Sequence, residues 1–172
     1  MKISIYKPNV NILNMKEEIS KIFAIFRYIN GRKIDMRNYN DRLNLQKLTY
    51  ILKKAGFNFS YYFSWYVKGP YSPLLASDAF NYFESNEDIN EKLSEAELKI
   101  VKDLKIAFGN ELQNPNKLEL YASLLFIKST SAIELSEDEK LSEKLISLKP
   151  WFNKEEVKEA IKKLRESRLF SN

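Results

Sequence analysis

The chain has 172 residues, of which 44% are hydrophobic and 30% charged, and it contains neither histidine nor cysteine. The missing residue types exclude disulfides, thiolate zinc sites, cysteine nucleophiles and every catalytic centre that uses a histidine base or ligand. The length suits one compact domain, and neither an apolar run of the roughly 20 residues that a membrane helix needs nor an N-terminal signal sequence is present. We therefore expect a cytoplasmic, non-enzymatic protein with no cofactor, no bound metal and no membrane partner.

The net charge of +5 is distributed unevenly along the sequence. Residues 1–75 carry 13 Lys and Arg against 4 Asp and Glu, a net charge of +9, whereas the remaining residues carry 15 basic and 19 acidic side chains, a net charge of −4. A basic first half is typical of proteins that bind nucleic acid or an acidic partner. It is also typical of the ordinary solvated surface of a lysine-rich protein.

Hydrophobic periodicity predicts a mainly α fold, a compact bundle of about seven helices with one or two short β-strands. Residues 1–7 alternate in the manner of a short strand. A first helix is predicted over about 15–30, with Glu17 and Glu18 in its first turn, where the helix dipole favours anions. A polar, basic loop separates it from a second helix over about 42–55.

The second helix has clear start and surface signals. Asp41 or Asn44 is expected to cap its N-terminus. Its leucines share one face of the helix, so Lys47, Lys53 and Lys54 are expected to face solvent.

Residues 57–73 hold eight of the 23 aromatic side chains of the chain. Aromatic and polar residues alternate over 59–68, which predicts a β-strand or an extended segment. The Gly-Pro pair at 69–70 is expected to break this strand. Ser72 and Pro73 then have the N-cap and first-turn residue types that open a helix.

Four further helices are predicted from their start signals in the second half. Each start is a Ser or Asn that precedes a helix-forming run, and the four are Ser94, Asn114 or Asn116, Ser136 and Asn153. Residues 94–172 are thus expected to form a helical C-terminal unit that packs on a core of residues 1–84 within a single compact domain.

Two segments, RLNLQKLTYILKKAG and YYFSWYVKGPYSPLL, carry a family resemblance. Together they resemble the uncharacterised YwgA-like proteins and are distantly similar to Panacea (SocA-like) antitoxin domains, which share a Leu-Gln-Lys-Leu helix and a Tyr/Trp-x-x-Gly-Pro turn. The matching residues are Leu45, Gln46, Lys47, Leu48, Tyr50, Tyr62, Phe63, Trp65, Tyr66, Gly69, Pro70, Tyr71, Ser72, Pro73 and Leu75. The resemblance implies an antitoxin or adaptor that binds other proteins. The chain departs from the pattern at Asn44, where a lysine is common.

A non-catalytic protein-interaction module is the function that we expect. The predicted protein-binding residues belong to the strand and its turn, and they are Tyr62, Tyr66, Lys68, Gly69, Pro70 and Tyr71. The partner is an unknown protein, with a second copy of the chain as another candidate. The same motif has a purely structural interpretation, because Gln46 and Lys47 can reach the strand or the Gly-Pro turn and fix it between two helices.

The alternative is a DNA- or RNA-binding regulator. Its predicted contacts come from the first two helices and the loop between them, and they are Arg27, Arg32, Lys33, Arg37, Arg42, Lys47, Lys53 and Lys54. These side chains would bind phosphates, and the neighbouring Tyr61, Tyr62, Trp65 and Tyr66 would stack on bases. The loop is too long for a simple helix-turn-helix, although a winged-helix variant fits.

No motif in the sequence points convincingly to catalysis. Ser4 and Lys7 have the Ser-x-x-Lys spacing of some acyl transferases, but no companion motif follows. The pairs at 97–99 and 156–158 have the Glu-x-Lys spacing of metal-dependent nucleases, yet both lie in predicted helices, where residues two apart diverge. The acidic residues at 134–139 are interpreted as a helix start.

Overall fold

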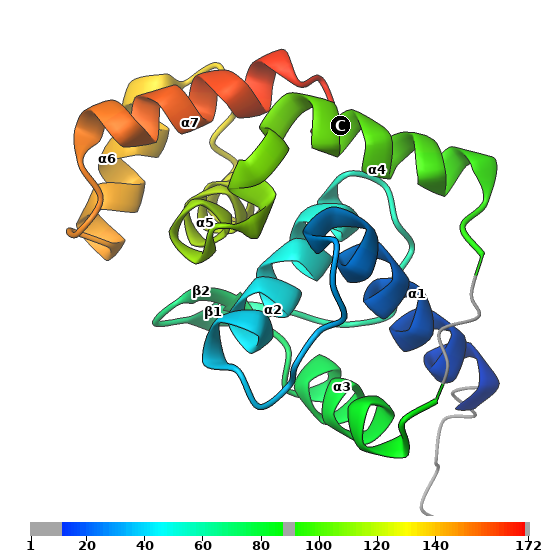
Figure 1. The fold of residues 1–172 in the computed structure, drawn as a ribbon. Coiled ribbons are helices and arrows are strands. Elements are labelled where there is room, and N and C mark those ends of the chain that lie inside the picture. Colours follow the sequence, from blue (N-terminus) through cyan, green and yellow to red (C-terminus); the bar gives the residue numbers. More distant parts are fainter. Residues whose placement is uncertain (1–11, 88–91, 171–172) are drawn as a thin grey trace, which may run out of the picture.

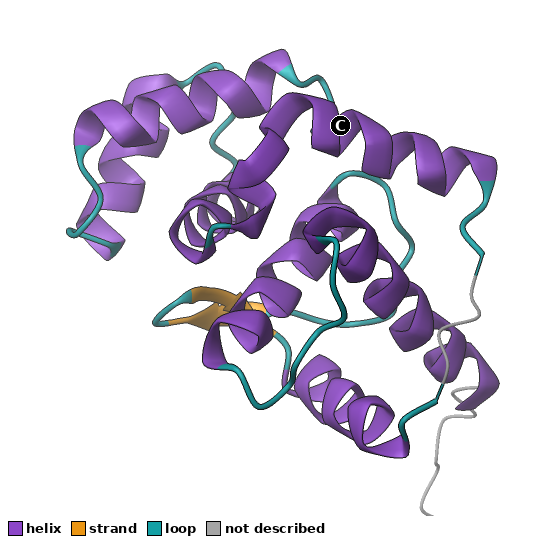
Figure 2. Cartoon of the chain, viewed as in Figure 1, coloured by secondary structure: helices purple, strands orange, loops and turns teal. Residues whose placement is uncertain are grey.

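The computed structural model of the protein describes residues 12–87 and 92–170, so the predicted strand over 1–7 and the Ser4–Lys7 pair lie outside the described residues. The described part is mainly α-helical with one two-stranded sheet, which confirms the predicted fold class (Figures 1 and 2). The elements are α1 (Ile12–Asn30), α2 (Tyr39–Lys54), β1 (Ser64–Tyr66), β2 (Gly69–Tyr71), α3 (Pro73–Ser85), α4 (Glu95–Phe108), the 3₁₀-helix η1 (Gly109–Gln113), α5 (Pro115–Ser131), α6 (Asp138–Leu148) and α7 (Lys154–Glu166).

Helix α5 lies at the centre of the molecule (Figure 1). One side of α5 packs against α2 and β2, and another packs against α6 and α7. Its sequence explains this position, because apolar residues occur on nearly all of its faces and most are buried. Among the described residues, no helix combines the length and hydropathy that a membrane span requires.

Helix α1 begins earlier than predicted. It starts at Ile12, so the placement of Glu17 and Glu18 in its first turn is wrong. Glu18 instead points to a distant segment, and its Oε2 accepts hydrogen bonds from the backbone N (3.0 Å) and Oγ (2.8 Å) of Ser60. The carboxylate therefore joins α1 to the aromatic segment.

Helix α2 also begins before the predicted residue, and its predicted caps are wrong. Asn38 is the N-cap, and its side chain accepts hydrogen bonds from the first turn. Asn44 lies inside the helix, as does Asp41, which is buried. The Asp41 carboxylate accepts two bonds from the Arg32 guanidinium (2.7 and 2.6 Å) and one from the Asp35 backbone N (2.8 Å), so it fixes the α1–α2 loop.

Five helix starts in the rest of the chain were predicted, and four are confirmed. The side chains of Ser72, Ser94, Asn114 and Asn153 all accept hydrogen bonds from the first turn of their helices. The predicted capping box at 136–139 is wrong, since α6 begins at Asp138 and its N-cap residue Glu137 makes no capping bond. The Glu137 Oε2 accepts from the backbone N of Glu134 (3.0 Å) instead, which turns the carboxylate toward the preceding loop.

The predicted strand over 59–68 is only partly formed. Residues 57–63 are extended but lie outside the two strands, because side chains from helices hold their backbone. Lys53 Nζ donates to the carbonyl oxygens of Phe59 (2.8 Å) and Tyr61 (2.7 Å). The alternation nevertheless sets burial as expected, since Phe59 and Tyr61 are buried and Tyr62 is 87% exposed.

The two strands form an antiparallel hairpin, residues 64–71. Its register pairs Ser64 with Tyr71, Trp65 with Pro70 and Tyr66 with Gly69. The turn lies at residues 67 and 68. The prediction that the Gly-Pro pair breaks the strand is therefore wrong, because this pair lies within β2.

Candidate binding site

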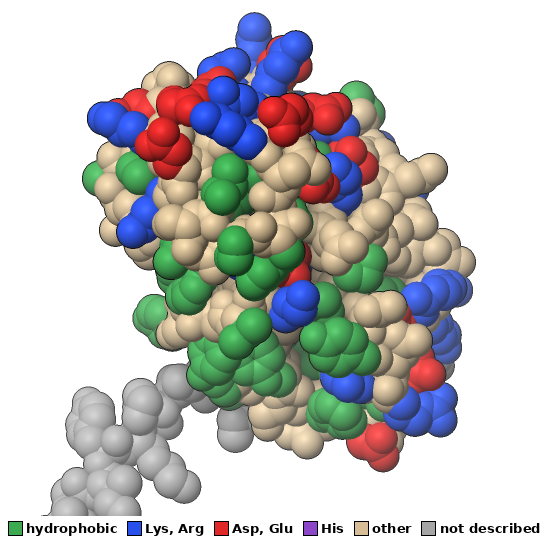
Figure 3. Space-filling model, turned by 90° about the vertical axis from the view of Figure 1, so that its left-hand side faces the viewer, with side chains coloured by type: hydrophobic (Ala, Val, Ile, Leu, Met, Phe, Trp, Pro, Cys, Tyr) green, Lys and Arg blue, Asp and Glu red, His purple; other side chains and the backbone are tan. Residues whose placement is uncertain are grey.

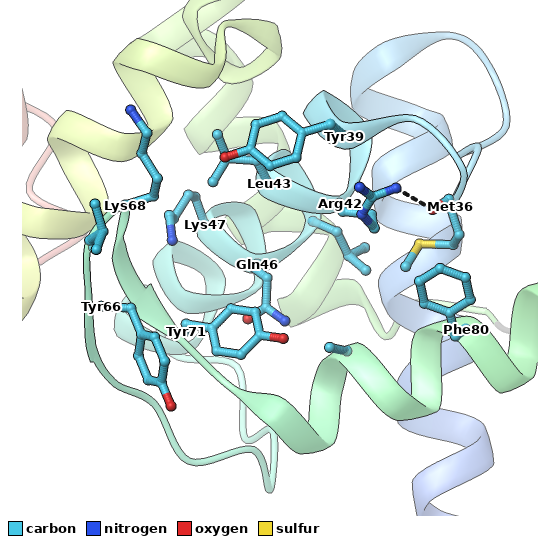
Figure 4. A pocket seen from close by; sticks show the side chains of 14 residues that line it. Met36, Tyr39, Arg42, Leu43, Gln46, Lys47, Tyr66, Lys68, Tyr71 and Phe80 are labelled. Carbon is cyan, nitrogen blue, oxygen red and sulfur yellow. Dashed lines mark hydrogen bonds between the residues drawn. The ribbon is translucent and has the colours of Figure 1, made fainter.

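A cavity of about 530 Å³ lies between α2, the hairpin and the start of α3 (Figure 4). Its lining is mostly apolar and aromatic, and the lining residues are Met36, Tyr39, Arg42, Leu43, Leu45, Gln46, Lys47, Tyr66, Val67, Lys68, Gly69, Tyr71, Ala76 and Phe80. Sequence segments that are far apart thus meet at one site: the α1–α2 loop, α2, the hairpin and α3.

Large apolar side chains around this cavity are exposed to solvent. Tyr39 is 57% exposed, Tyr66 50%, Val67 77% and Phe80 41%. Figure 3 shows hydrophobic side chains gathered in the middle and lower part of this face, with acidic and basic side chains mainly near the top and at the lower right. The rings of Tyr66 and Tyr71 contact each other at a centroid distance of 5.0 Å, which orders this part of the rim.

Two consecutive residues of α2 bind the backbone of β2 and of the residue that follows it. The Gln46 side-chain amide forms a reciprocal pair with Ser72, since its Nε2 donates to the carbonyl of Ser72 (3.0 Å) and its Oε1 accepts from the backbone N of Ser72 (2.9 Å). Lys47 Nζ donates to the carbonyl of Pro70 (2.6 Å). Lys47 thus reaches β2 itself, as expected, whereas Gln46 binds the residue that directly follows the strand.

Lys47 was predicted to face solvent, and this is wrong. Only 1% of the residue is exposed, because α2 turns this side chain toward β2 and α5. Burial lowers the pKa of Lys47 to about 7; Glu119 opposes the shift, whereas Lys149 and Lys68 reinforce it. The amine is bound to a backbone carbonyl, which gives it a role in fixing the hairpin.

The turn of the hairpin is fixed from the C-terminal part of the chain. Lys149, which follows α6, is completely buried, and its Nζ donates to the carbonyl of Val67 (2.7 Å) and to Glu119 Oε1 (2.6 Å). The same amine lies over the rings of Trp65 (5.2 Å) and Trp151 (4.8 Å). The buried pair of Lys149 and Glu119 therefore connects α5 and the end of α6 to the turn.

Gly69 lies where only a glycine fits without strain. Its φ is +84°, and a Cβ at this position would lie 2.6 Å from Ser123 Oγ on α5. The Ser123 hydroxyl is buried and has no hydrogen-bond partner among the described residues. The close approach of β2 to α5 is thus the reason for a glycine at this position.

The structure separates the predicted protein-binding residues into three groups. Tyr66, Lys68 and Tyr71 line the cavity, and Tyr62 does not belong to its lining. Gly69 also lines it but is buried, and Pro70 is buried and does not belong to the lining. The side chains available for contact at the cavity are therefore those of Tyr66, Lys68 and Tyr71.

Most of the predicted nucleic-acid contacts are already engaged within the protein. Five of the eight bind carboxylates or backbone carbonyls: Arg32, Arg37, Arg42, Lys47 and Lys53. Lys54 Nζ lies 5.5 Å from the centroid of the Tyr50 ring. Arg27 and Lys33 are exposed, and neither makes a side-chain hydrogen bond or ion pair with the described part of the chain.

Several residues of the site were missed at the sequence level. Tyr39, Val67 and Phe80 were not singled out because each lies beside polar neighbours in sequence, and only the fold brings them together. Glu119 and Lys149 were also missed. Glu119 had a usable signal, since it is the one acidic residue in the apolar run LELYASLLFI.

No cluster suited to a metal was found within residues 12–87 and 92–170, where no three acidic side chains converge. The Glu-x-Lys pairs at 97–99 and 156–158 lie in α4 and α7, as predicted. Comparison of the chain with protein-family models, with curated proteins and with solved structures found no match.

Proposed function

We propose that the protein is a non-catalytic protein-interaction module that binds a segment of a partner in the cavity between α2, the hairpin and α3. The main support is the ring of exposed Tyr39, Tyr66, Val67 and Phe80 around an apolar hollow. Contiguous exposed apolar surface on a small protein commonly marks an interaction site, and buried aromatic anchors contribute most of the binding energy at interfaces.

The rigidity of the hairpin also supports this proposal. A hairpin of two three-residue strands is marginal alone in water. Here Lys47 of α2 and Lys149 after α6 bind its backbone, and Gln46 of α2 binds Ser72 directly after it. A surface that is fixed before binding loses little conformational entropy when a partner docks, which favours affinity.

The resemblance to YwgA-like proteins and, distantly, to Panacea antitoxin domains agrees with the proposal. Gln46, Lys47, Gly69 and Ser72 belong to the matching pattern, and these are the residues that fix the hairpin next to α2 and α5. An antitoxin or adaptor would use such a preformed surface to recognise its partner.

Peptides selected from a displayed random library on the wild-type protein test the proposal. Phe80→Ser and Val67→Ser each remove an exposed apolar side chain, worth about 1.5–3 kcal/mol when buried, so binding of a selected peptide should weaken by roughly tenfold or more. Tyr62→Ser is the matched control, because this ring is exposed but lies outside the lining. Equal binding by all variants, or failure to select any peptide, would contradict the proposal.

Nucleic-acid binding by the basic first half draws less support from the geometry. A phosphate backbone would have to compete with the internal partners of Arg32, Arg37, Arg42 and Lys53. Retention on heparin or DNA that falls steeply with added salt, and that is lost after replacement of Arg32, Lys33 and Arg37 by Ala, would favour this function instead.

A further inference from the structure

The charged residues that line the cavity all have the same sign. Three of the lining residues are basic, namely Arg42, Lys47 and Lys68, and no Asp or Glu occurs among the described residues of the lining. Acidic side chains outside the lining are paired with cations. Asp41 pairs with Arg32, Asp35 pairs with Arg37, and Glu119 pairs with Lys149 and Lys68.

Arg42 retains donors for a ligand. Its Nη1 donates to the carbonyl oxygens of Met36 and Arg37, both at 2.9 Å. These two bonds hold the guanidinium at the wall of the cavity. Neither Nε nor Nη2 has an acceptor among the described residues, so both can bind a carboxylate.

Lys68 offers a second cation from the opposite wall. Its side chain is 46% exposed, and its Nζ lies 3.4 Å from Glu119 Oε2, a loose ion pair. Lys149 already binds the other oxygen of Glu119 at 2.6 Å. Glu119 is therefore shared by two lysines, and Lys68 keeps part of its positive charge for a ligand.

The two cations stand apart, and an aromatic side chain lies between them. Figure 4 shows Lys68 on the hairpin side of the cavity with its amine pointing upward, and Arg42 on α2 beside Met36; Tyr39 lies between the two and Tyr71 lies below them. A ligand that fills this cavity would meet an apolar middle and a cation on either side.

We propose that the cavity recognises a partner segment in which acidic residues flank apolar ones, with carboxylates at Arg42 and Lys68 and apolar side chains between Tyr39, Tyr71 and Phe80. This inference rests on the proposed function and specifies the chemistry of the partner. A nucleic acid fits the site less well, because its phosphates repeat along a chain whereas these cations are separated by apolar surface.

Fluorescence anisotropy with two synthetic peptides tests the inference. Both peptides share a core of Leu and Phe, which is flanked by Glu in one and by Lys in the other. The Glu-flanked peptide is expected to bind the wild-type protein at least about tenfold more tightly, because two partly desolvated charge pairs contribute about 1.4 kcal/mol or more together. The preference should decrease as salt is added.

Matched variants show where the charge acts. The double variant Arg42→Gln/Lys68→Gln should weaken binding of the Glu-flanked peptide by about tenfold. The double variant Arg27→Gln/Lys33→Gln removes the same charge outside the cavity and should change binding by less than about twofold. The single variant Lys68→Gln changes only a residue of the exposed turn. It tests the charge preference while the bonds from Arg42 to the α1–α2 loop stay intact.

The outcomes distinguish this inference from the proposed function. Equal binding of both peptides, with loss of both after Phe80→Ser, would refute the charge preference and leave the interaction module intact. Binding of neither peptide, in an assay where library-selected peptides also fail, would overturn both. A single-stranded oligonucleotide that displaces the Glu-flanked peptide, and whose own binding is lost in Arg27→Gln/Lys33→Gln, would assign the recognition to phosphates and overturn the inference.

Discussion

Replacement of Lys47 by Met tests whether a buried amine makes the stability of this protein depend on pH. Burial lowers the pKa of Lys47 to about 7, whereas an ordinary lysine has a pKa of about 10.5. Its Nζ is bound to the Pro70 carbonyl, and three charged groups surround it at the hairpin, Glu119, Lys149 and Lys68. The folded protein therefore releases this proton far more readily than the unfolded chain.

The sign of the effect follows from proton counting. Between about pH 7 and about pH 10 the unfolded chain holds the Lys47 proton and the folded protein does not, so the contribution of Lys47 to stability rises with pH. From about pH 6 to about pH 9 the two pKa values give a rise of about 3 kcal/mol in the free energy of unfolding. Methionine cannot titrate, so the variant lacks this rise.

Urea unfolding followed by tryptophan fluorescence measures the effect at both pH values. The stability of wild type minus that of Lys47→Met should increase by about 2–3 kcal/mol from about pH 6 to about pH 9. The control for the loss of a lysine as such is Lys33→Met, which makes the same substitution at an exposed position. A difference for Lys47→Met that stays constant, or that decreases at the higher pH, would refute the reasoning.

Two further predictions concern the supports of the hairpin, both measured by urea unfolding. Gly69→Ala should lower the free energy of unfolding by about 3 kcal/mol, because its φ is positive and the new Cβ overlaps with Ser123. Adding Ser123→Ala should restore roughly half of this loss. A double variant that is no more stable than Gly69→Ala would show that the overlap costs nothing. Glu119→Gln should lower the free energy of unfolding by about 3–5 kcal/mol, because Lys149 stays buried without its carboxylate partner. The control Glu156→Gln, in a partly exposed ion pair, should lower it by at most about 1 kcal/mol. Equal losses in the two variants would contradict this prediction.

Features that depend on a few neighbouring residues were predictable from the sequence. The helix starts at Ser72, Ser94 and Asn153 are examples, because a side-chain oxygen there meets backbone N–H groups two or three residues later. The alternating burial of Phe59, Tyr61 and Tyr62 is also local, since successive side chains of an extended segment point to opposite sides.

Features that depend on distant partners were not predictable. The extent of the strand is one, because the alternation over 57–63 is that of a strand, while its backbone bonds go to Glu18 and Lys53 from two helices. Burial of Lys47 is another. Lysines are almost always exposed, and the carbonyl that compensates for this burial, that of Pro70, lies 23 residues away.

The presence of proline in β2 explains why the site needs both halves of the chain. Pro70 has no backbone N–H, and β2 has only three residues, so backbone pairing with β1 can contribute little. Side chains add bonds that hold the hairpin, and they come from Lys47 of α2 on one side and from Lys149 after α6 on the other. The exposed surface of the cavity is built by α2, the hairpin and α3, but its shape depends on Glu119 and Lys149. Substitutions at those two buried residues should therefore alter binding at the cavity without touching its lining.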